Sequence, residues 1–176
     1  MMKTALSILI SALALSSCGK PKTGATTEAA TPAVSTDPWF TATAPSNPSP
    51  IHLLRQSAKP GDIITLTGKI LGREKPFVDD RAAFILGDPT ALKPCNEIPG
   101  DACTTPWDVC CESAEDKLAN TATIQLVDEK GRVLKQGLKG VQGLKELSEV
   151  TLVGTVAPSS SPEALIVNAT AIHIAR

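Results

Sequence analysis

Apolar residues gather in separate stretches along the chain. The first stretch, residues 5–15, is apolar except for Ser7 and Ser11. The later ones are rich in β-branched residues and end at turn residues such as Gly87-Asp88-Pro89. This pattern predicts β-strands at residues 63–71, 82–86, 121–127, 150–156 and 165–174.

Three stretches show further regularities. Residues 63–71 alternate poorly between apolar and polar, which is typical of a strand buried on both faces. Residues 121–127 lead through a four-residue turn signal into residues 132–135, a pattern that predicts a hairpin. Val141, Leu144 and Leu147 recur at helical spacing and predict a helix of about two turns.

The apolar run at residues 5–15 is too short to cross a bilayer and follows Lys3, as in the signal peptide of an exported protein. It ends in Leu15-Ser16-Ser17-Cys18. This resembles a bacterial lipoprotein signal with its lipobox. The resemblance implies cleavage after residue 17 and acyl chains, such as palmitate, on Cys18. Gly19 after the cysteine implies the outer membrane, facing the periplasm; an ordinary secretory signal is the alternative.

Residues 18–50 are expected to form a disordered tether. Ala, Thr, Pro and Ser dominate them, so they offer too little large apolar surface to offset the entropy of ordering. Trp39-Phe40 is the one apolar island. This pair could dock on the domain or on a partner, or it could stay unattached.

Residues 51–176 are expected to form one β-rich domain. The order of three strands, a short helix and two strands resembles the OB-fold, a five-stranded Greek-key barrel. The resemblance rests on residues 61–68 as first strand, 147–154 as helix exit and fourth strand, and 166–174 as last strand. The predicted domain is similar to small OB-like domains of envelope lipoproteins. This likeness of fold implies no activity. A β-sandwich is the alternative.

Residues 88–118 form a Cys-rich, acidic insertion between the second and third predicted strands. Exported thiols are normally oxidised, so we expect two disulfides among Cys95, Cys103, Cys110 and Cys111. A bond between the two adjacent cysteines is disfavoured. That leaves Cys95–Cys110 with Cys103–Cys111, or Cys95–Cys111 with Cys103–Cys110. A metal-binding or thiol-redox function is the alternative, but paired Cys-x₂-Cys knuckles are lacking, so neither metal nor other cofactor is expected.

Charge and aromatic content argue against nucleic-acid binding. The formal net charge is −1, and the chain has no tyrosine, three phenylalanines and two tryptophans, whereas single-strand binders need a basic groove with aromatic platforms. No motif of a hydrolase or phosphate-binding loop occurs, so no catalytic residue is expected. The candidate binding residues are Arg73, Lys75, Arg81, Asp101, Trp107 and Asp108.

These features predict a membrane-anchored, extracytoplasmic lipoprotein. Its OB-like domain is expected to be a non-catalytic binding or scaffold module that contacts an envelope protein or a glycan, while membrane lipid holds the acylated Cys18.

The anchor gives the first testable prediction. Cys18→Ser removes the sulfur that would carry the lipid, so the variant should appear unprocessed or in the soluble fraction, whereas the unaltered protein stays in the membrane pellet after a carbonate wash. Immunoblotting of both fractions measures this. Equal membrane retention of the two proteins would contradict the lipoprotein assignment.

Overall fold

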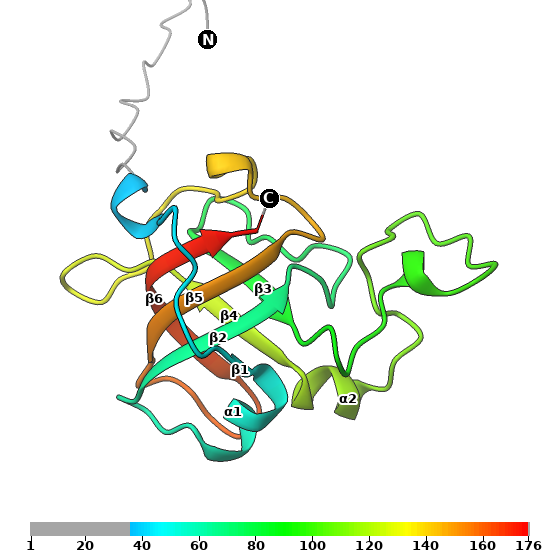
Figure 1. Cartoon of the computed structure of the whole chain (residues 1–176), viewed down its shortest axis with the longest axis horizontal. Coiled ribbons are helices and arrows are strands. Elements are labelled where there is room, and N and C mark those ends of the chain that lie inside the picture. The colour runs from blue at the N-terminus through cyan, green and yellow to red at the C-terminus, as the bar shows by residue number, and fades with distance from the viewer. Residues whose placement is uncertain (1–35, 176) are drawn as a thin grey trace, which may run out of the picture. The chain divides into compact units, whose positions relative to one another are not determined.

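The computed structural model describes residues 36–175, and the predicted signal peptide and Cys18 lie outside them. The described chain is mainly β (Figure 1). Its strands are β1 (Ser49–Pro50), β2 (Ile63–Lys69), β3 (Ala83–Gly87), β4 (Thr121–Gln125), β5 (Glu149–Val156) and β6 (Leu165–Ile174). Within the described residues, no helix is long and apolar enough to cross a membrane.

A single sheet closes on itself to form a five-stranded barrel. The strand order is β1-β2-β3-β4-β6-β5, and β2 also pairs with β5. The β4–β6 pairing is parallel, while the β3–β4, β2–β5 and β5–β6 pairings are antiparallel. This confirms the OB-like barrel and excludes the β-sandwich alternative, which would need two packed sheets.

The barrel interior is filled by alternate residues of the strands. In β2 buried and half-buried residues alternate, so the expectation of a strand buried on both faces is wrong there. That description fits β3, in which all five residues are buried. The outer side of β3 is covered because Leu71, Leu92 and Val109 form a small apolar cluster beside the main core.

The cysteines lie in the β3–β4 connection, residues 88–120 (Figure 1). It contains a 3₁₀ turn at Cys95–Glu97 and the short helix α2 (Ala114–Ala119). The Ser113 side chain begins α2 by accepting a hydrogen bond from the backbone N–H of Asp116.

The barrel is in contact with residues that the sequence analysis assigns to the tether. Residues 36–50, assigned to the tether, lie along the barrel and are called the strap below. Phe40 forms a parallel bridge with Ile172, and Ser49–Pro50 pairs in parallel with β2. Trp39 and Phe40 pack against the main core, and this burial offsets the cost of ordering the polar residues around them. The strap leads into helix α1 (Ile51–Ser57).

The helix predicted around residues 141–147 is only a 3₁₀ turn at Val141–Gly143. Gly140 and Gly143 have φ values of 87° and 86°, and Leu147 has a φ of 64°. Right-handed helix cannot continue through such residues. Leu144 is nevertheless fully buried in the main core. The apolar spacing therefore identified a core residue, but the predicted helical conformation is wrong.

The strap provides a test of this packing. Phe40→Ala should lower the free energy of unfolding by about 1–3 kcal/mol because the ring is partly buried against the core. Leu53→Ala removes a side chain that is 49% exposed and should change stability by less than about 0.5 kcal/mol. Urea unfolding of both variants measures the difference, and equal stabilities would show that the strap does not dock.

Candidate functional site

The indole of Trp107 joins the β3–β4 connection to the loop that follows β2. Its Nε1–H donates a hydrogen bond of 2.8 Å to the carbonyl oxygen of Glu74, and the backbone N–H of Gly72 donates one of 3.3 Å to the carbonyl oxygen of Trp107. Two loops that lie far apart in the sequence therefore form one wall beside the barrel.

This wall borders a hollow of about 480 Å³, the lateral groove. Its other sides come from β3 and β4, from α2 and from the loop before β6. The residues that line it are Gly72, Arg73, Glu74, Ile85, Asp108, Ala114, Lys117, Leu118, Thr121, Thr123, Glu163, Ala164 and Leu165. OB barrels bind ligands over the second and third strands, between the loops that follow the first and fourth strands. The lateral groove occupies that position.

The lining of the lateral groove mixes both signs of charge with small apolar patches. Arg73 and Lys117 supply cations, and Glu74, Asp108 and Glu163 supply carboxylates. A hydrogen bond from the Ser161 hydroxyl lowers the pKa of Glu163.

The predicted binding residues separate into three groups. Arg73 and Asp108 line the lateral groove, and Trp107 positions its wall. Lys75 and Arg81 are exposed on the loop between β2 and β3 and do not line it. The Asp101 carboxylate instead accepts a hydrogen bond of 2.7 Å from the backbone N–H of Cys103.

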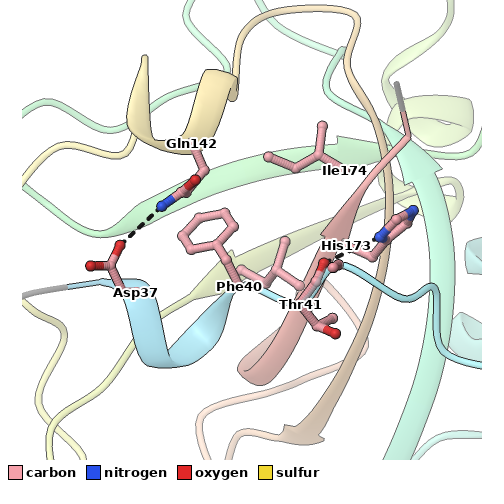
Figure 2. Close-up of a pocket in the computed structure, with 8 residues that line it drawn as sticks. Asp37, Phe40, Thr41, Gln142, His173 and Ile174 are labelled. Carbon is pink, nitrogen blue, oxygen red and sulfur yellow. Dashed lines mark hydrogen bonds between the residues drawn. The ribbon is translucent and has the colours of Figure 1, made fainter.

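A second hollow, of about 440 Å³, lies between the strap and the end of β6 (Figure 2). The side-chain amide of Gln142 donates a hydrogen bond of 2.9 Å to the Asp37 carboxylate, and His173 Nδ1 lies 3.2 Å from the carbonyl oxygen of Thr41. These polar groups bind one another across the hollow. These contacts hold the strap against the barrel.

The four cysteines of the β3–β4 connection are free thiols in the structure. Three of them converge, because the Sγ atoms of Cys95, Cys103 and Cys110 all lie within 4.8 Å of one another. The Sγ atoms of Cys95 and Cys110 are 3.5 Å apart. Cys111 lies at the margin, with its Sγ 4.0 Å from that of Cys110. The two predicted disulfides stay a prediction, with both pairings open.

The environments of these thiols differ. Burial, followed by the neighbouring thiols of Cys110 and Cys103, raises the pKa of Cys95 to about 12. Hydrogen bonding to the side chain and backbone of Thr105 lowers the pKa of Cys103. The adjacent Cys110 thiol raises the pKa of Cys111. Cys103 is therefore the first of these three thiols to become a thiolate as pH rises.

A buried carboxylate that the sequence analysis missed connects the end of β3 to α1. Asp88 is 1% exposed, and its Oδ2 lies 2.8 Å from His52 Nδ1 and 3.1 Å from the His52 backbone nitrogen. Its Oδ1 accepts hydrogen bonds from the hydroxyl and the backbone N–H of Thr90. The turn signal Gly87-Asp88-Pro89 does not indicate that this carboxylate binds His52, which lies 36 positions away in the sequence.

Comparisons with known protein families, with curated proteins and with solved structures give no match. The barrel and its side chains are therefore the basis for inferring what the protein does. The lateral groove and the converging thiols each bring chemically distinctive groups together.

Asp88 gives a prediction with a defined pH dependence. Burial alone would raise its pKa, but the hydrogen bonds from Thr90 and His52 outweigh burial and hold the pKa below its usual value. A lowered folded-state pKa stabilises the protein above the unfolded value of about 3.9, and the contribution is lost as pH falls through the folded-state pKa.

Asp88→Asn should therefore lower the free energy of unfolding at pH 7 by about 1–3 kcal/mol, because an amide cannot accept from all these donors. The deficit should shrink as pH falls below about 4. Urea unfolding between pH 7 and pH 2.5 measures this, with exposed Asp79→Asn as the control. A deficit that is independent of pH would argue against a charge effect.

Proposed function

We propose that this protein is a non-catalytic binding module of the bacterial cell envelope that takes a glycan in the lateral groove. The observation that carries the proposal is the groove's position on the barrel together with its lining of mixed charge. Small-ligand sites commonly combine an apolar wall with a few polar groups that fix orientation.

The chemistry of the lining favours a polyhydroxylated ligand. A sugar hydroxyl both donates and accepts hydrogen bonds, so it can satisfy the Arg73 guanidinium and the Asp108 or Glu163 carboxylates at once. Ile85 and Leu118 offer apolar surface to the C–H faces of a sugar ring. Fully desolvating these charges without such partners would cost free energy.

The same lining disfavours an anionic polymer. A phosphate backbone would gain two cations but would meet three carboxylates in the groove. None of the residues that line the groove is aromatic, so it offers no stacking platform for bases. An envelope glycan therefore fits better than a nucleic acid.

The cellular location in this proposal rests on the lipobox resemblance. A lipid on Cys18 would anchor the chain in the outer membrane with the barrel in the periplasm. The strap shortens the tether, because the described barrel contacts begin at residues 36–40 and not at residue 51.

The proposal is tested with purified peptidoglycan sacculi as the probe. The protein should co-sediment with the sacculi, and a double variant Arg73→Ala with Lys117→Ala should bind at least about tenfold more weakly, a change of about 1.4 kcal/mol. The matched control is Lys130→Ala with Lys135→Ala, which makes the same change in net charge at exposed residues outside the groove.

Two results would contradict the glycan assignment. The first is an equal loss of sacculus binding in the control variant, which would indicate unspecific charge attraction. The second is the absence of any sacculus binding together with salt-dependent binding of single-stranded oligonucleotides, which would place a nucleic acid in the groove.

A further inference from the structure

Three sulfur atoms converge on one point of the β3–β4 connection. The Sγ atoms of Cys95, Cys103 and Cys110 lie within 4.8 Å of one another, and those of Cys95 and Cys110 are 3.5 Å apart. A Zn–S bond is about 2.3 Å long, so sulfur atoms in a tetrahedral site are about 3.8 Å apart. The three thiols are thus spaced as ligands of a single ion would be.

We propose that Cys95, Cys103 and Cys110 form a three-thiolate site for a soft d¹⁰ cation, Zn²⁺ or Cu⁺. Thiolate ligands select these ions over hard cations such as Mg²⁺ or Ca²⁺. Among residues 36–175, three residues make up the set of mutually close donors, so a fourth position on the ion would be left for water or an added ligand. The site is independent of the glycan proposal, because it rests on sulfur positions alone.

Backbone hydrogen bonds hold the three thiols in place. The N–H of Cys95 donates to the carbonyl oxygen of Asp108 at 2.8 Å, which brings the chain around residue 95 beside Cys110. The N–H of Asn96 donates to the carbonyl oxygen of Pro106 at 3.0 Å, and that of Cys103 donates to the Asp101 carboxylate. Donors that are fixed in this way need little rearrangement to bind an ion.

The three cysteines differ in how far they are exposed to solvent. Cys95 is 2% exposed, while Cys103 is half-buried and Cys110 is exposed. An ion can therefore reach the site past Cys110 and have Cys95 as its innermost ligand. Binding breaks three S–H bonds, forms three metal–sulfur bonds and releases three protons to solvent, with no transfer of electrons.

Cys111 supplies a matched control. It is a neighbouring, exposed cysteine whose Sγ lies 4.0 Å from that of Cys110, but it is not one of the three mutually close donors. Cys111→Ser makes the same chemical change as Cys110→Ser, one residue further along the chain. The two variants should therefore differ in metal content although they are alike in mass and charge.

The test uses the full chain purified from its own envelope without reductant or chelator. Elemental analysis should find about one equivalent of zinc or copper, and which metal is found distinguishes the two ions. Cys95→Ser, Cys103→Ser and Cys110→Ser should each reduce the bound metal at least tenfold, and Cys111→Ser should leave it unchanged. A chelator should make the three ligand thiols reactive without any reductant, in addition to the Cys111 thiol, which should react before the chelator is added.

A metal-free protein whose intact mass shows two disulfides would overturn the proposal, as would equal loss of metal in Cys111→Ser. Far-ultraviolet circular dichroism checks that each variant keeps the barrel. Should a variant fail to fold, Co²⁺ added to the reduced parent chain under argon provides a second readout. Thiolate-to-cobalt absorption with the visible bands of tetrahedral Co²⁺ supports the site, and its absence overturns it.

Discussion

Closure of the barrel rests on the pairing of β2 with β5. Seven residue pairs join these strands, from Ile63 with Thr155 to Lys69 with Glu149, whereas β2 and β3 share a single pair. Glycines allow the close approaches that closure needs: a Cβ at Gly154 would lie 2.6 Å from Val167 Cγ1, and one at Gly68 would lie 2.7 Å from the Gly87 carbonyl oxygen. Gly154 also stands where the β5–β6 register shifts by a bulge.

Closure has a consequence for where binding chemistry can lie. The barrel interior is filled by the buried side chains of the main core. Distinctive side chains are therefore carried by the connections, and the longest of these in the described chain, residues 88–120, is fixed to the barrel by Leu71, Leu92 and Val109. The rigid barrel thus positions a segment that has little apolar core of its own.

The sequence predicted the barrel strands well because each of them carries its own local signal of β-branched residues and turn boundaries. It could not predict the strap, because burial of Phe40 depends on Ile172, which is far away along the chain. The helix predicted from the apolar spacing of residues 141–147 is wrong, because that spacing carries no information about the positive φ angles that nearby glycines adopt. Charge and position led to Arg73 and Asp108, which line the lateral groove. The Asp88–His52 contact and the convergence of three thiols exist only after folding.

One short stretch of chain serves both candidate sites. The side chain of Asp108 lines the lateral groove, while its carbonyl oxygen accepts the hydrogen bond that places Cys95 beside Cys110. Trp107, immediately before it, ties the same stretch to the loop after β2. Because these groups share one backbone, any bond that draws the three sulfur atoms together, whether to a metal or between cysteines, also fixes the wall of the groove. A pre-ordered wall lowers the entropy lost when a ligand binds, so a bond that joins the sulfur atoms would favour binding in the proposed groove.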